Sequence, residues 1–283
     1  MHQHHSHHHH AAGEGDHAAL LDLDAEALGP FLDEVTAWVA THVPAEPRTV
    51  ADVGAGTGTG TLALARRFGA ADIVAIDRSA PMLARVRAAA SGAGAGGRLR
   101  TVHADLDEAW PEVGALDVVW AALFLHEAAD PDRLLRDVHA ALNPGGVLAV
   151  VEMDSFPRFL PDDIGFGRPG LESRCHAILE RENWNAHPDW REHLDRAGFD
   201  VAEVRVFPTG GHPAPDATRR YARHWLGRTR DFLADKLAAD DLEALDRLLA
   251  EEGPDSLVRR DDLTVRGTRT AWAARKSQRA RRN

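Results

Sequence analysis

VADVGAGTGTG, residues Val50 to Gly60, decides the fold, because a short β-branched run leads directly into four glycines at every second position. Glycine loses more conformational freedom on folding than any other residue, so this density of glycines requires a reason. In an open parallel sheet, a glycine loop between the first strand and a helix is where a nucleotide-like ligand binds. The stretch therefore predicts a ligand site at the end of a strand.

The residues after the glycine loop alternate between short apolar runs and helical patterns. We expect strands at residues 49–53, 72–77, 98–103, 116–121, 147–153, 199–207 and 268–275. Helices are expected at residues 24–42, 58–68, 79–90, 131–142, 171–184, 189–197, 216–236 and 240–251. Such alternation indicates an α/β fold in which a doubly wound, mostly parallel sheet is covered on both faces.

The chain divides into four predicted parts. Residues 1–17 form a His-rich head that is expected to be disordered, because it has nothing to bury. Residues 18–47 form a helical cap, and residues 48–155 form the ligand-binding core. Residues 156–283 hold the last two strands and, between them, a helical pair at about 216–251 that we expect to act as a substrate lid.

The first ten residues, MHQHHSHHHH, fit either an affinity tag or a natural metal-binding tail, and the sequence leaves both readings open. Imidazole is a common ligand of Zn and Ni. The histidines expected to bind Ni or Zn are His4, His5, His7, His8, His9 and His10. No metal site is expected within the fold itself.

Composition restricts the partners and the compartment. Acidic residues outnumber basic ones by 44 to 33, and the net charge of −11 argues against nucleic acid or a membrane surface as a partner. Cys175 is the only cysteine, which is typical of a reducing cytoplasm. No apolar stretch is long enough to span a bilayer, and the N-terminus has no secretory pattern. We therefore expect a soluble cytoplasmic protein.

Three kinds of ligand compete for the glycine loop. A phosphate-binding P-loop ends in Gly-Lys-Ser/Thr, and the chain contains no Gly-Lys pair. A dinucleotide fingerprint fits only on Gly58, Gly60 and Ala63, although such a fingerprint should begin where the strand ends. The register that does begin at the strand end is Asp52-x-Gly54-x-Gly56-x-Gly58.

This D-x-G-x-G-x-G register resembles the first motif of the class I S-adenosylmethionine-dependent methyltransferases. The resemblance implies a Rossmann-like, seven-stranded sheet with an antiparallel last strand, and S-adenosylmethionine as the cofactor. It places the Asp52 carboxylate near the ammonium and sulfonium groups of the cofactor. Gly54, Gly56 and Gly58 would let the main chain lie against its methionine part.

Further residues match the family at the ends of later strands. Asp77, which ends IVAID, matches the acid that accepts hydrogen bonds from both ribose hydroxyls. Asp105, in VHADL, matches the acid that accepts from the adenine amino group. The other residues that the resemblance assigns to the cofactor pocket are Arg78, Met82, Leu106 and Ala122. The Asn143-Pro144-Gly145-Gly146 turn matches the family's entry into the fifth strand.

In a methyltransferase with a doubly wound sheet, we expect the molecule that accepts the methyl group to bind beyond the C-terminal ends of the strands. His126, in ALFLHEAAD, is the candidate general base, because histidine titrates near neutral pH; the alternative is that it supports the loop. The candidate substrate residues are Asp154, Trp184, Trp225 and Arg228, each of which also fits an ordinary surface or core role. We also expect Tyr221, Trp225, Phe232 and Leu233 to form the inward stripe of the lid.

The sequence thus predicts methyl transfer to a small molecule, similar to the methyltransferases of quinone and natural-product biosynthesis, with a homodimer as a possible assembly. Whether oxygen, nitrogen or carbon is methylated stays open. Two alternatives from other classes also stay open: a nicotinamide-dependent oxidoreductase, and a non-catalytic protein that binds S-adenosylmethionine or a metal.

Overall fold

The computed structural model describes residues 11–182, 189–210 and 214–276. Its strands are β1 Thr49–Val53, β2 Asp72–Asp77, β3 Leu99–His103, β4 Leu116–Ala122, β5 Leu142–Met153, β6 Phe199–Pro208 and β7 Thr268–Lys276. They form one seven-stranded sheet in the order β3-β2-β1-β4-β5-β7-β6. The first five strands run parallel, and β7 pairs antiparallel with both β5 and β6. This confirms the predicted doubly wound sheet with an antiparallel last strand.

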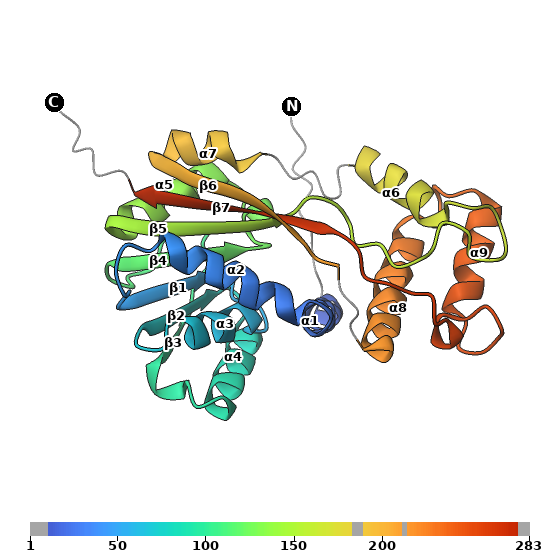
Figure 1. Ribbon diagram of the computed structural model, residues 1–283, viewed down its shortest axis with the longest axis horizontal. Coiled ribbons are helices and arrows are strands. Elements are labelled where there is room, and N and C mark those ends of the chain that lie inside the picture. The colour runs from blue at the N-terminus through green and yellow to red at the C-terminus, as the bar shows by residue number, and fades with distance from the viewer. Residues whose placement is uncertain (1–10, 183–188, 211–213, 277–283) are drawn as a thin grey trace.

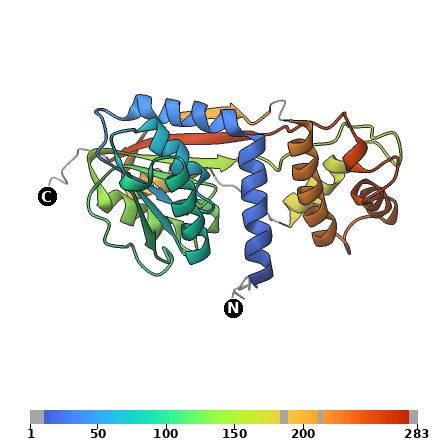
Figure 2. The same ribbon diagram turned by 90° about the horizontal axis from the view of Figure 1, so that it is seen from below.

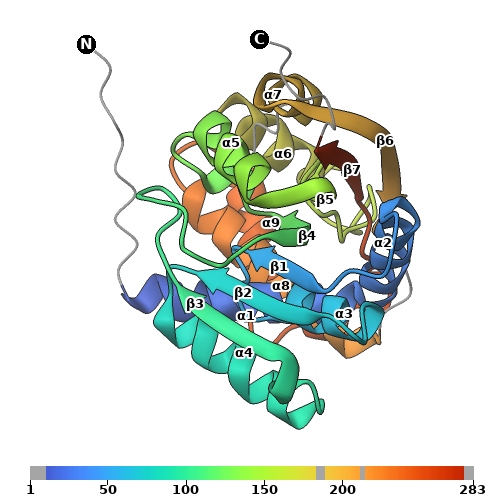
Figure 3. The ribbon, with the colours of Figure 1, turned by 90° about the vertical axis from the view of Figure 1, so that its left-hand side faces the viewer.

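Helices cover both faces of the sheet, as Figure 3 shows. They are α1 Ala11–Ala27, α2 Gly29–His42, α3 Thr59–Arg67, α4 Ala80–Gly92, α5 Pro131–Ala141, α6 Leu171–Arg181, α7 Trp190–Ala197, α8 Pro215–Phe232 and α9 Ala239–Leu249. Helices α2 and α3 pack on one face, and α5 and α7 pack on the other. The strands are therefore apolar on both sides, which is why they read as continuous hydrophobic runs.

The N-terminal segment differs from the prediction. Helix α1 already begins at Ala11, so the residues expected to link a disordered head to the domain are helical instead. The expected single helix at residues 24–42 is two helices, which meet at Leu28. Pro30 causes the break, because proline has no N–H to continue a helix but fits the first turn of a new one.

Strand β5 begins earlier than predicted. Leu142 already pairs with Leu116, and the register shifts between Leu116 and Val118. The Asn143 side-chain amide donates to the Asp117 carboxylate at 2.8 Å, so the predicted Asn-Pro-Gly-Gly turn is a bulge held against β4.

Helices α6, α8 and α9 form a separate lobe beyond the C-terminal end of β5 (Figure 1). Helix α1 runs between the sheet and this lobe, as the view in Figure 2 shows. The expected helical pair α8 and α9 therefore lies at the edge of the sheet where ligands bind. Within the three described segments, no helix is long and apolar enough to cross a membrane.

Candidate functional site

The glycine loop follows β1 and is held to the end of β2. Gly54, Gly56 and Gly58 have φ values of +69°, +52° and +93°, which L-residues with side chains rarely adopt. Both carboxylate oxygens of Asp77 are engaged here: Oδ2 accepts from Gly56 N at 2.8 Å, and Oδ1 accepts from Ser79 N at 2.7 Å. Asp77 thereby ties the loop to the start of α4.

Two of the protein's own side chains cover these glycines. A Cβ atom on Gly54 would lie 2.2 Å from the ring of Phe124, and one on Gly56 would lie 3.0 Å from Cδ1 of Leu21. Phe124 follows β4, whereas Leu21 comes from α1. The side of the loop that the resemblance assigns to the methionine part of the cofactor is therefore packed against the β4 loop and the N-terminal helix.

Asp52 lies beneath the glycine loop and is 2% exposed. Its Oδ2 accepts a hydrogen bond from the Thr61 hydroxyl at 2.6 Å. Burial, with a smaller contribution from the charge of Asp77, raises the pKa of Asp52 to about 7, against the opposing effect of the Thr61 hydrogen bond. This carboxylate thus faces α3 and is only partly ionised at neutral pH.

The remaining predicted cofactor residues gather beside the loop, at the C-terminal ends of β2, β3 and β4. Asp105 Oδ1 accepts from Asp107 N at 2.9 Å, which forms the turn after β3. The His103 ring contacts the Arg78 carbonyl oxygen at 2.9 Å. Met82 and Leu106 are buried, and Ala122 ends β4 half-buried.

His126 lies in the loop after β4, between two carboxylates. Its Nδ1 is 2.8 Å from Oε2 of Glu152, and its Nε2 is 3.5 Å from Oε1 of Glu127. Burial opposes protonation, but the two carboxylates outweigh it and raise the pKa of His126 to about 10. The His126 hydrogen bond lowers the pKa of Glu127 to about 2. The imidazole is therefore cationic at neutral pH.

Glu152, near the end of β5, organises this loop and was not assigned a role from the sequence. It is 1% exposed. Its Oε1 accepts from the backbone N–H groups of Phe124 and Leu125, at 3.2 and 3.0 Å. The sequence did carry a signal for this role, since Glu152 is the one acidic residue in the apolar run VLAVVEM. A charge buried in such a run needs polar partners.

The backbone is strained where this loop begins. Leu123 has a φ of +51° and is the only non-glycine residue with a positive φ in the described segments. Its N–H donates to Val151 O at 2.8 Å. Strain of this kind persists only where the surroundings determine it and clusters at functional sites.

The predicted substrate residues are not all brought to one place. Asp154 accepts from the Thr270 hydroxyl at 2.5 Å, so its carboxylate is tied to β7. Trp225 is buried in the lobe, with its ring 5.8 Å from that of Phe156, and Arg228 is half-buried on the same helix. Trp184 lies outside the described residues, as do the histidines of the head.

The predicted lid stripe is wrong at one position. Tyr221, Trp225 and Leu233 are buried, as expected. Phe232 is 39% exposed instead, and the Lys236 ammonium lies 4.4 Å from its ring. Phe232 is the last residue of α8 and is not among the buried residues of that helix.

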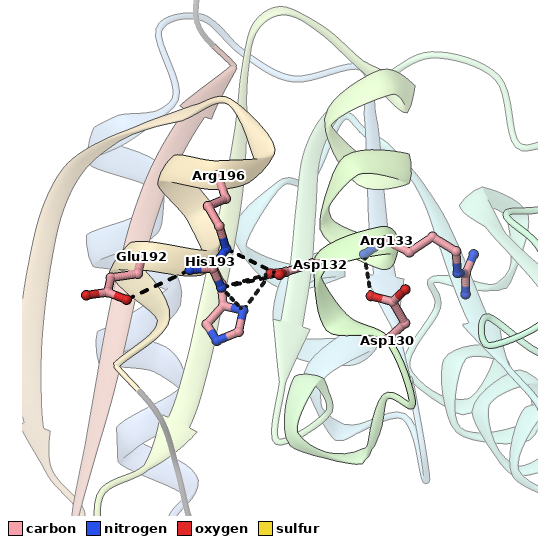
Figure 4. A network of polar contacts seen from close by, with 6 residues as sticks. All are labelled: Asp130, Asp132, Arg133, Glu192, His193 and Arg196. Carbon is pink, nitrogen blue, oxygen red and sulfur yellow. Dashed lines mark hydrogen bonds and ion pairs between the residues drawn. The ribbon is translucent and has the colours of Figure 1, made fainter.

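A second polar network joins the beginning of α5 to α7 (Figure 4). Asp132 accepts from the His193 ring at 2.6 Å and from the Arg196 guanidinium at 3.3 Å. The His193 hydrogen bond lowers the pKa of Asp132. These contacts fasten α7 to α5 on the face of the sheet, which is a structural role.

Among the residues that the structure describes, no three His, Cys, Asp or Glu side chains are grouped so as to hold a metal ion. The predicted metal binding by the head thus falls on residues outside the description.

A doubly wound sheet with a glycine loop and acids at the ends of β1, β2 and β3 is the arrangement in which proteins of this fold class bind nucleotide-like ligands. Residues 50–146 match a family model described as a methyltransferase domain. A trans-aconitate 2-methyltransferase of Methylobacterium radiotolerans is 36% identical over 197 residues, which cover 64% of this chain and 70% of that protein. A demethylmenaquinone methyltransferase of Thermus thermophilus is 34% identical over 113 residues, 40% of this chain and 50% of that one.

The chain belongs to the class I S-adenosylmethionine-dependent methyltransferase family. The matched region spans less than two thirds of other relatives, at 64% of a trans-aconitate 2-methyltransferase from Rhodopseudomonas palustris and 59% of one from Variovorax paradoxus.

Solved structures agree on the fold. A Bacillus halodurans protein assigned as a methyltransferase is 18% identical, with a TM-score of 0.55, over 86% of this chain and 99% of that one. A Galdieria sulphuraria protein assigned as a sarcosine dimethylglycine methyltransferase is 16% identical, with a TM-score of 0.52, over 87% of both chains.

Proposed function

We propose that this protein binds S-adenosylmethionine at the C-terminal ends of β1, β2 and β3 and transfers its methyl group to a small-molecule acceptor. The observation that carries the proposal is the glycine loop, which has three positive-φ glycines and is tied to Asp77 through Gly56 N, in a chain of this family. S-adenosylmethionine supplies a methyl group on a sulfonium, which is a good leaving group. Catalysis then rests largely on holding acceptor and methyl in line.

The residues at this edge fit such a cofactor. Each Asp77 oxygen accepts one backbone N–H, and a carboxylate oxygen has a further lone pair for a ribose hydroxyl. Asp105 and Leu106 would border the adenine, together with Arg78 and Met82. Phe124 and Leu21 lie where the methionine part would go, so binding requires both side chains to shift.

His126 is better suited to positioning than to the base role that the sequence predicted. A general base must be neutral to accept a proton, and the pKa of about 10 keeps this imidazole protonated. With Glu152, it holds the loop after β4 in place at the entrance to the acceptor region.

The acceptors to test first are trans-aconitate and a demethylmenaquinone, because these compounds appear in the names of relatives.

A cytoplasmic location is also proposed; it is supported by Cys175, a buried thiol and the chain's only cysteine. The net charge of −11 supports small molecules rather than nucleic acid as partners. A homodimer is proposed too, and light scattering would test it.

The deciding experiment measures binding of S-adenosylmethionine, S-adenosylhomocysteine and NAD by calorimetry, followed by transfer of a labelled methyl group to each acceptor. Asp77→Ala should weaken cofactor binding by roughly 1.5–3 kcal/mol for each charge-assisted hydrogen bond lost. Asp72→Ala is the matched control, because Asp72 is exposed at the opposite end of the same strand. Preferential binding of NAD would instead favour an oxidoreductase, and cofactor binding without methyl transfer would favour a sensor.

A further inference from the structure

Three side chains from distant parts of the chain meet at one buried point. Asp24 of α1 accepts from the Tyr221 hydroxyl of α8 at 2.7 Å. It also accepts twice from Nη2 of Arg269, the second residue of β7, at 2.6 and 2.8 Å. The Arg269 side chain is only 7% exposed. An always-charged guanidinium is thus held almost out of water.

A small cavity lies beside this cluster, at the edge of the sheet where an acceptor would lie. Arg269 pairs with Met153, the last residue of β5, and both line the cavity. The polar side chains that also line it are Asp24, Ser155, Thr209, Tyr221 and Thr268. The cavity therefore lies between the C-terminal end of β5, α1 and the helical lobe.

Arg269 does not use all its donors. A guanidinium has five N–H donors and no acceptor. Within the described part of the chain, its hydrogen bonds all leave from Nη2 and end on Asp24, so the N–H groups of Nε and Nη1 have no hydrogen-bond partner. Neither nitrogen is among the fully buried polar atoms that lack a partner, so both remain accessible to a ligand.

Stability alone does not account for this arrangement. The free energy needed to remove two charges from water often exceeds the attraction between them. Replacing a buried ion pair by apolar residues is therefore frequently neutral or stabilising. The lining is also rich in donors: Ser155, Thr209 and Thr268 add hydroxyls to the unused guanidinium N–H groups. The one carboxylate, Asp24, already accepts three hydrogen bonds.

We propose that this cavity is a subsite of the acceptor pocket in which Arg269 binds a carboxylate group of the methyl acceptor. A carboxylate brings about four lone-pair sites to a donor-rich lining, and its bonds to a guanidinium are charge-assisted. Asp24 and Tyr221 hold the guanidinium by one nitrogen and leave its other donors for the ligand. The inference rests on the proposed methyl transfer, because that function places an acceptor at this edge.

The test compares small carboxylates with their amides, which have similar shape but no charge. Fumarate with fumaramide and succinate with succinamide are titrated by calorimetry into the protein saturated with S-adenosylhomocysteine. The wild type should bind at least one acid about tenfold or more tightly than its amide. Arg269→Gln should lose this preference. Arg275→Gln should keep it, because Arg275 lies at the other end of β7.

Asp24→Asn keeps the test decisive if Arg269→Gln does not fold. The amide oxygen can still accept from Arg269, but the competing negative charge is gone, so acid binding should become tighter. If Asp24 and Arg269 only joined α1 to β7, Asp24→Asn would weaken binding or leave it unchanged, which would overturn the proposal. Equal binding of acids and amides by the wild type, or no binding of any acid, would also overturn it. S-adenosylhomocysteine binding in the same samples reports separately on the proposed function.

Discussion

The Nδ1 atom of His126 lies 2.8 Å from Oε2 of Glu152, so the end of β5 holds the loop that follows β4. The other oxygen of Glu152 accepts two backbone N–H groups of the same loop. One buried carboxylate thus fixes both the path of the loop and the protonation of its histidine.

Removing Glu152 should therefore cost stability and change the titration of His126. Glu152→Ala removes the closer carboxylate of His126 and leaves two backbone donors without their acceptor, and should lower the free energy of unfolding by about 1–3 kcal/mol. Glu152→Gln should lower the pKa of His126, as measured by NMR. Glu127→Gln is the control for stability, because that side chain is 59% exposed and should change unfolding by less than about 1 kcal/mol. An unchanged pKa in Glu152→Gln would contradict the assigned role.

Asp52 should make the protein less stable as pH rises. Its pKa is raised from 3.8 to about 7 in the folded state, so the folded chain binds more protons than the unfolded chain between these values. The stabilisation is complete below pH 3.8 and disappears as pH rises through 7, a difference of roughly 4 kcal/mol. Asp52→Asn should flatten the dependence of unfolding free energy on pH over this range. An equal slope in both proteins would refute the prediction.

Gly54→Ala should disrupt the loop at the end of β1. The alanine would keep the φ of +69°, which strains the backbone. Its Cβ would lie 2.2 Å from the Phe124 ring, which is a steric clash. We expect a loss of about 1–3 kcal/mol in unfolding free energy from the strain, together with weaker cofactor binding. Gly69→Ala is the matched control, because nothing lies within 4 Å of a Cβ at that position. Equal effects of the two substitutions would show that the Gly54 loop is not constrained.

Trp225 tests whether α8 and α9 act as a substrate lid. Trp225→Phe keeps an aromatic ring against Phe156 and so limits the loss of packing. For an acceptor found by labelled methyl transfer, it should raise KM or lower kcat with little change in cofactor affinity. Light scattering is measured in parallel. A shift from dimer to monomer with unchanged acceptor kinetics would assign this surface to an interface instead.

The His-rich head should be dispensable for methyl transfer. The appropriate deletion removes residues 2–10, because Ala11–Ala27 form α1 and Leu21 of that helix packs on the glycine loop. Turnover should stay within a few-fold of the parent, and most binding of Ni or Zn should disappear. A large loss of methyl-transfer activity in the deletion variant would contradict the prediction.

The sequence by itself determined the sheet and the place of the glycine loop. Strands such as Asp72–Asp77 and the glycines after Val53 are local signals, because the strand pattern and the positive φ of a turn depend on neighbouring residues. The acids at the ends of β1, β2 and β3 could be recognised for the same reason, since each follows directly from an identifiable strand.

Only the tertiary structure decided what surrounds those residues. Burial under the loop, not strand position, raises the pKa of Asp52, and two carboxylates on different elements make His126 cationic. Asp24 and Arg269 are 245 residues apart, and no local pattern records that α1 brings one to the other. Contacts between distant segments depend on how whole elements pack, and the pKa of a group depends on those contacts.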